Sequence, residues 1–174
     1  MTETPEQYTQ RILGNIEGKD PLRVHRETPQ RLQKLVARLD KKHLSRRPAP
    51  GKWSIQEVLA HLADAEIVLS WRLRQIVTQD GVSIQAYDQD LWANAFQYSK
   101  RDPKQSLAMF RTLRESNVAI LKSLPKEKWN NHGMHSERGK ETVAHLLRMI
   151  AGHDLNHMKQ IDTLAKTKKS ARRK

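Results

Sequence analysis

The chain contains no cysteine among its 174 residues. Disulfide bridges, thiolate metal ligands and a cysteine nucleophile are therefore excluded. Any metal ion that this protein binds must be held by nitrogen or oxygen atoms.

Long hydrophobic runs are lacking as well. No stretch approaches the roughly 18 apolar residues that a membrane-spanning helix needs, so we expect no membrane insertion. Residues 1–7 lack a basic region followed by an apolar one, so we expect no secretory signal, a mature chain that begins near Met1, and a cytoplasmic protein. The length favours one domain with a continuous core.

Glycine is scarce and scattered. The seven glycines form neither a G-x-x-x-x-G-K nor a G-x-G-x-x-G pattern, so nothing indicates a phosphate-binding loop for nucleotides. Strand signals are nearly absent too, whereas helix signals recur along the chain.

Acidic residues are outnumbered, 19 against 32 lysines and arginines, which gives a formal net charge of +13. Six of these positive charges lie in residues 166–174, and without them the charge is 13 − 6 = +7. Because this tail has no large apolar residue to bury, we expect a disordered, solvated segment after a domain of residues 1–165. A specific nucleic-acid-binding arm is the less favoured interpretation.

Apolar residues at helical spacing predict four long helices and one short helix. The expected ranges are about 29–39, 54–78, 103–124 and 142–164, with the short helix over 5–16. Capping signals precede three of the long helices: Thr28 before Pro29, the capping box of Ser54 and Glu57, and Asp102 before Pro103.

Each apolar stripe must pack against another, so the economical architecture is an all-α four-helix bundle. Residues 81–101 form a long connection between the second and third long helices. Connections of this length in compact bundles are more often functional than idle, so we expect this one at the active site.

His153 and His157 stand four residues apart in the apolar stripe of the last helix. The other members of that stripe are Val143, Leu146, Leu147, Ile150, Ile161 and Leu164. An unpaired buried polar group costs about 1–3 kcal/mol, so two imidazoles on this face need partners. Histidines at i and i+4 converge well on one metal ion. Chance placement of two histidines on one helix is the alternative.

His61 is the candidate for a third metal ligand. It lies at the edge of the second helix's apolar face, beside Val58 and Leu62, so packing of the second helix against the fourth would bring it to His153 and His157. Three neutral imidazoles leave at least one coordination position for water or substrate. A buried histidine with a purely structural role is the alternative.

Three segments resemble the DinB-like superfamily, especially its YfiT-like metal-dependent branch: GKWSIQEVLAHLADAE (residues 51–66), YDQDLWA (87–93) and AGHDLNHMKQI (151–161). The resemblance spans about residues 28–164. It implies an unusual four-helix bundle that binds nickel or zinc through three histidines, which correspond here to His61, His153 and His157.

The resemblance also implies a range of activities. The superfamily includes thiol S-transferases that use low-molecular-weight thiols such as bacillithiol, a mycothiol-dependent isomerase, and proteins described as metal-dependent hydrolases. A divalent ion with neutral ligands lowers the pKa of bound water toward about 7 and favours a bound thiolate. We therefore expect an enzyme that activates a low-molecular-weight thiol for transfer to a small electrophile. A metal-dependent hydrolase that activates water is the alternative.

Several further residues are weaker candidates for the site. Gln160 and Asp64 are candidates to orient the imidazoles, with a solvated or capping role as the alternative for Asp64. Tyr87 and Trp92, together with Trp53, are candidates to line a substrate pocket, although aromatic residues at such positions also fill cores.

The remaining histidines and one aspartate carry weaker expectations. His135 is expected to approach the site from the loop before the last helix. Surface positions are expected for His25, His43, His132 and His145, and a surface or interhelix position for Asp154.

Two noncatalytic functions are also weighed. A nucleic-acid-binding module would use the +13 charge, and its affinity would fall steeply with salt. A structural metal-binding bundle would hold its ion without an exchangeable coordination position. The sequence leaves a homodimer open.

Overall fold

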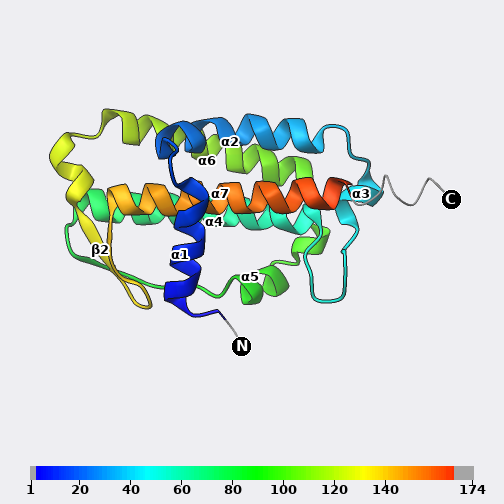
Figure 1. Ribbon diagram of the computed structural model, residues 1–174, viewed down its shortest axis with the longest axis horizontal. Coiled ribbons are helices and arrows are strands. Elements are labelled where there is room, and N and C mark those ends of the chain that lie inside the picture. The colour runs from blue at the N-terminus through cyan, green and yellow to red at the C-terminus, as the bar shows by residue number, and fades with distance from the viewer. Residues whose placement is uncertain (1–2, 167–174) are drawn as a thin grey trace.

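Four long helices form the body of the protein, whose computed structural model describes residues 3–166 (Figure 1). They are α2 (Pro21–Val36), α4 (Ile55–Thr78), α6 (Pro103–Ser123) and α7 (Val143–Lys166). Both α2 and α4 contact α6 and α7, so the four helices close a ring. The predicted all-α four-helix bundle is confirmed. The expected basic tail lies, beyond Lys166, outside the described residues.

The start of α4 follows its capping chemistry. The Ser54 hydroxyl accepts a hydrogen bond from the Glu57 backbone N–H, and the Glu57 carboxylate accepts one from the Ser54 N–H. These bonds satisfy donors that a helix N-terminus leaves free. Asp102 caps α6 in the predicted place.

The predicted start of the first long helix at Pro29 is wrong. Asp20 caps α2 eight residues before Thr28, and Pro29 lies inside the helix. Proline has no N–H to bond the carbonyl one turn earlier, which belongs to His25. That carbonyl instead accepts a hydrogen bond from Arg114 Nη1 at 2.8 Å. A contact with α6 therefore replaces the helical bond that Pro29 removes.

The predicted short helix is α1 (Pro5–Ile16), which crosses α7 at a steep angle (Figure 1). The crossing is close at Gly152, where an added Cβ would lie 2.2 Å from the backbone oxygen of Ile12. Only glycine permits this approach. The crossing places the N-terminal residues beside His153, the next residue of α7.

A small three-stranded sheet is present that the sequence did not reveal. β1 (Val82–Ile84) pairs in parallel with β2 (His132–His135), which pairs antiparallel with β3 (Gly139–Thr142). Strands of three or four residues are too short to display an alternating pattern. The remaining short elements are α3 (Lys41–Ser45), α5 (Gln89–Ala95), and the 3-10 turns η1 (Tyr98–Lys100) and η2 (Lys126–Asn130).

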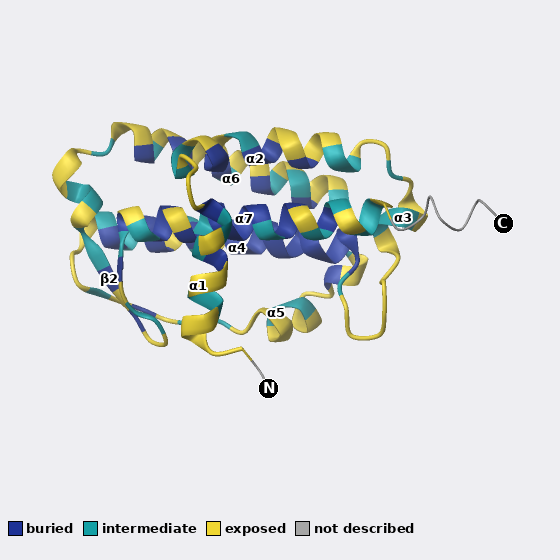
Figure 2. Cartoon of the chain, viewed as in Figure 1, coloured by how far each residue is buried: buried dark blue, intermediate teal, exposed yellow. Residues whose placement is uncertain are grey.

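Burial is deepest along α4, which is covered from several sides (Figure 2). Every residue from Ile55 to Glu66 is buried. One apolar cluster includes Leu59 and Ile161, and a second cluster, further along α4, includes Leu73 and Val143. The buried carboxylates Asp64 and Glu66 of α4 lie between the two clusters. No helix within residues 3–166 combines the length and apolarity needed to cross a membrane.

Candidate metal centre

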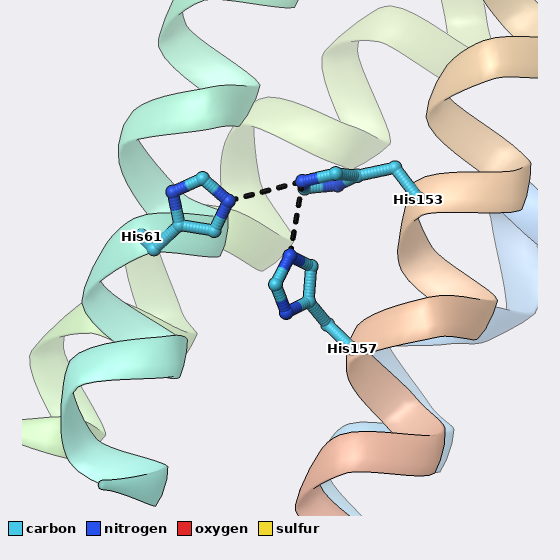
Figure 3. A group of neighbouring side chains, drawn as sticks. All are labelled: His61, His153 and His157. Atoms are coloured by element: carbon cyan, nitrogen blue, oxygen red, sulfur yellow. Dashed lines mark hydrogen bonds between the residues drawn. The ribbon is translucent and has the colours of Figure 1, made fainter. Parts of the chain in front are cut away.

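Three imidazoles meet between α4 and α7 (Figure 3). The Nε2 atom of His153 lies 3.0 Å from that of His61 and 3.1 Å from that of His157. Metal–nitrogen bonds of about 2.0–2.1 Å at tetrahedral angles place ligand nitrogens roughly 3.3 Å apart. Two of the three Nε2 separations thus approach the spacing of ligands on one ion, and the ligand atoms of all three histidines lie within 4.8 Å of one another.

The two helices supply these side chains for simple geometric reasons. His153 and His157 are one turn apart on α7 and so share a face. His61 is buried, with 1% of its surface exposed, on the part of α4 that packs against α7. Its ring lies 4.9 Å and 5.1 Å, centroid to centroid, from those of His157 and His153.

Burial keeps the three rings neutral. It lowers the pKa of His61 and of His153 well below the usual histidine value, and the neighbouring histidines lower both pKa values further. Burial also lowers the pKa of His157 to about 4, against the opposing effect of the hydrogen bond that its ring donates to Gln160. Neutral imidazoles present the lone pairs that a divalent cation requires. The donor set of three nitrogens without a thiolate or carboxylate fits nickel and zinc alike.

Gln160 lies next to this centre, on the turn of α7 that follows His157. Its Oε1 is 2.8 Å from His157 Nδ1. An amide oxygen only accepts hydrogen bonds, so this contact places the His157 proton on Nδ1 and leaves the Nε2 lone pair free. The Nδ1 atoms of His61 and His153 have no hydrogen-bond partner among the described residues.

Asp64 was expected to orient an imidazole, but its hydrogen bonds go to residues other than His61. Its carboxylate accepts hydrogen bonds from the Tyr98 hydroxyl at 2.8 Å and from Arg101 Nη1 at 2.7 Å. The Trp53 ring packs against His61 instead, with 5.0 Å between ring centroids. Asp64 thus ties η1 to α4, and an aromatic ring covers the outer side of His61.

A cavity of about 620 Å³ reaches His61 and His153. Its walls come from the N-terminal residues, the start of the long connection, the β2–β3 turn and α4; they include Tyr8, Arg72, Tyr87, His135 and Arg138. The volume falls within the range of small-molecule sites.

Tyr87 lines this cavity, as expected, whereas Trp92 is not among the lining residues. The Trp92 ring packs behind Tyr87, with 4.7 Å between centroids, and also contacts Phe96. Burial raises the pKa of Tyr87 to about 12, so its hydroxyl remains protonated at neutral pH. The long connection therefore contributes one polar side chain to the wall and one aromatic support.

Of two further residues that line the cavity, the sequence predicted one and missed the other. His135, the last residue of β2, approaches the site as expected and is 3% exposed. Arg72 was not predicted. It lies eleven residues after His61, which is close to three helical turns and hence on the same face of α4.

The expected surface position of His25 is wrong, whereas Asp154 takes the interhelix position that was one of its two expectations. His25 is fully buried in α2, and Asp154 is fully buried between helices. Asp154 accepts a hydrogen bond from Arg114 Nη1 at 2.7 Å, and Glu66 accepts one from Arg114 Nη2 at 2.8 Å. An arginine on α6 thus compensates the two carboxylates. The pairing of Arg114 with residues of two other helices cannot be predicted from the pattern of a single helix.

The family follows from the match of residues 25–161 to the model of the DinB superfamily. The chain belongs to the DinB superfamily. A Bacillus subtilis relative, named "Putative metal-dependent hydrolase YfiT", is 26% identical over 163 residues, which cover 92% of this chain and 91% of the relative. An Oceanobacillus iheyensis relative, also named as a putative metal-dependent hydrolase, is 25% identical over 142 residues, covering 82% of each chain.

The solved structure of YfiT from Bacillus subtilis has the same fold. It matches with a TM-score of 0.79 at 22% identity, over 95% of this chain and 89% of YfiT. That structure is described as an unusual four-helix bundle topology. The family resemblance and the fold expected from the sequence are therefore both confirmed.

Proposed function

We propose that this member of the DinB superfamily is an enzyme that depends on a divalent metal ion bound by His61, His153 and His157. The observation that carries the proposal is the convergence of three neutral imidazoles beside a 620 Å³ cavity that His61 and His153 line. His153 Nε2 lies 3.0 Å from that of His61 and 3.1 Å from that of His157. A bound divalent ion would lower the pKa of a coordinated water or thiol and so supply a nucleophile at neutral pH.

The chain's own residues would hold and shield this centre. His61, His153 and His157 bind the ion, and Gln160 fixes the tautomer of His157. Trp53 and the apolar residues of α4 exclude water from behind the rings, while the cavity admits a small substrate from the other side. Water exclusion strengthens the electrostatic interactions inside such a site.

The names of the relatives support water as the nucleophile, because each is called "Putative metal-dependent hydrolase". A second candidate is transfer of a low-molecular-weight thiol to a small electrophile, for which the cavity leaves room. A hydrolase needs room for one organic molecule, whereas a transferase needs room for two, and about 620 Å³ is ample for two small molecules. Nickel and zinc are the proposed ions.

The test begins with protein loaded with one equivalent of zinc or nickel. A panel of activated esters, amides and alkyl halides is offered with and without a low-molecular-weight thiol, and products are identified by mass spectrometry. Hydrolysis without thiol supports the hydrolase, and thioether or thioester products that need both metal and thiol support the transferase. Turnover that persists after chelation of the metal, in protein shown to be metal-free, would contradict both.

A further inference from the structure

Arg72 carries a buried positive charge that no carboxylate of the described residues pairs. The residue is 8% exposed, and its one hydrogen bond runs from Nη2 to the Gln85 carbonyl oxygen at 2.6 Å. A guanidinium has five N–H donors, so most of its capacity is unused. Arg114, which is buried more deeply, pairs with two carboxylates. Arg72 is therefore the exception among the buried arginines.

The buried acid Glu141 offsets this charge only in part. Glu141 is buried in β3, but Arg138 binds it through Nε at 2.7 Å and Nη2 at 3.2 Å. Burial lowers the pKa of Arg72 and the charge of Arg138 lowers it further, against the smaller raising effects of Glu141, Tyr87 and Glu137. An unpaired buried charge is costly. Because Arg72 lines the cavity, an anionic ligand can supply the missing partner.

His135 offers a second donor beside Arg72. Its Nδ1 accepts a hydrogen bond from the Glu137 backbone N–H at 3.2 Å, so the neutral ring carries its proton on Nε2. That Nε2 is buried and has no partner among residues 3–166. His135 pairs with Ile84 in the sheet, and the next residue after Ile84 is Gln85, the partner of Arg72. A cation and a neutral donor thus share one wall.

The position of Arg72 relative to the histidines sets the size of the ligand. Eleven residues of α4 separate its Cα from that of His61, about 16 Å along one helix face. Side chains on a helix lean toward its N-terminus, which for Arg72 is the direction of His61. Both side chains line the same cavity, so one extended small molecule can reach both.

We propose that Arg72, assisted by the Nε2–H of His135, binds a carboxylate of the substrate while the reacting end of that substrate lies at the three histidines. This inference rests on the proposed function and names its substrate class: small acids whose carboxylate is separated from the reacting group by several bonds. A planar carboxylate matches the fork of a guanidinium, and charge-assisted pairs of this kind are strong.

The test compares two probes that differ only at one end, 6-mercaptohexanoate and 6-mercaptohexanol. Full-length zinc-loaded protein is titrated with each by calorimetry, and the Arg72 Nε–H signal is followed by NMR. We expect the acid to bind at least about tenfold more tightly and to shift the Arg72 signal, since a charge-assisted bond forms only with the carboxylate. Arg72→Gln should abolish the preference. Arg148→Gln, which removes an exposed charge from α7, should retain it.

Equal binding of the two probes by the wild type, or a preference that survives Arg72→Gln, would overturn the inference while leaving the metal centre intact. Hexanoate, which has no thiol, separates the two proposals. If 6-mercaptohexanol does not bind the zinc-loaded protein but 6-mercaptohexanoate and hexanoate shift the Arg72 signal equally and bind with equal affinity, the thiol-activating function fails and the carboxylate site stands. If no carboxylate shifts that signal, the carboxylate site is wrong.

Discussion

Two buried polar clusters share α4 and α7, and they differ in whether their bonding capacity is filled. In the ion cluster, Arg114 donates to both carboxylate oxygens of Glu66 and to both of Asp154, and Asn117 adds a further bond to Glu66. In the histidine cluster, two Nδ1 atoms have no partner among the described residues, and the three Nε2 atoms face one another.

Adjacent residues of α7 divide between these clusters. His153 turns toward the cavity, while Asp154, about 100° further around the helix, turns toward α6. A cluster whose donors and acceptors are all paired among themselves stabilises the fold, whereas a cluster with unused lone pairs can bind something else. The two buried arginines show the same contrast. Arg114 pairs with two carboxylates, whereas Arg72 pairs with none among the described residues.

The largest effect should come from breaking the ion cluster. Arg114→Met leaves two carboxylates buried without a counter-charge, and we expect a loss of about 3–5 kcal/mol in the free energy of unfolding. Urea denaturation of metal-free protein measures it. Arg111→Gln, on the same helix, breaks an exposed pair with Glu115 and should leave the free energy of unfolding nearly unchanged. Similar losses in the two variants would contradict the structural role of the cluster.

The histidine cluster should respond in metal affinity rather than in stability. His61→Ala, His153→Ala and His157→Ala each leave two imidazoles, and we expect affinity for zinc to fall by at least about 100-fold, with metal-free protein still folded. Competition with a chelator measures the affinity. His145→Ala, also on α7 but outside the centre, should bind as the wild type does. Loss of affinity in only two of the three variants would make the third histidine structural.

Substitutions of Gln160 and Asp64 should have different effects, the first on zinc affinity and the second on stability. Gln160→Ala frees the His157 ring, so zinc affinity should drop by about 10- to 100-fold with little change in stability. Asp64→Asn weakens the contacts to Tyr98 and Arg101, so stability should fall while zinc affinity holds. The reverse pattern would mean that Asp64, not Gln160, orients a ligand.

The smallest effect concerns His25, whose buried ring nitrogens have no partner among the described residues. Burial lowers the pKa of His25 well below the usual histidine value, and the charge of Arg114 lowers it further. As the pH falls below about 6.5, this histidine therefore binds a proton in the unfolded chain but not in the folded protein. Wild-type stability should therefore decline with acidification through that range. His25→Leu should lessen the decline, by up to about 1.4 kcal/mol for each pH unit below about 6.5, and not destabilise at pH 7.5. Unfolding curves from pH 7.5 to 4.5 test this. Parallel pH profiles would contradict it.

Much of the fold was predictable because its signals are local. The capping box at Ser54 and the cap at Asp102 locate α4 and α6 correctly, since both involve residues adjacent in the sequence. Pro29 misled the prediction because its compensation comes from Arg114, 85 residues away. The strands were missed because pairing between β1 and β2 joins distant segments that are individually too short to recognise.

The candidate site divides in the same way. The spacing of His153 and His157 and the face of His61 were visible on single helices, and the structure brings the three together. Asp64 shares α4 with His61, yet the positions of Tyr98 and Arg101 decide its partners. Arg72 and its missing counter-charge required the whole three-dimensional arrangement, because an unpaired charge is recognised only when every neighbour is known.

X-ray absorption at the metal edge tests the central claim most directly. Protein loaded with one equivalent of zinc should show three imidazole nitrogens at about 2.0–2.1 Å and an additional light-atom ligand. The triple variant His61→Ala/His153→Ala/His157→Ala should bind no stoichiometric zinc. A spectrum without imidazole scattering, or an unchanged spectrum in the triple variant, would contradict the assignment of these histidines as the metal centre.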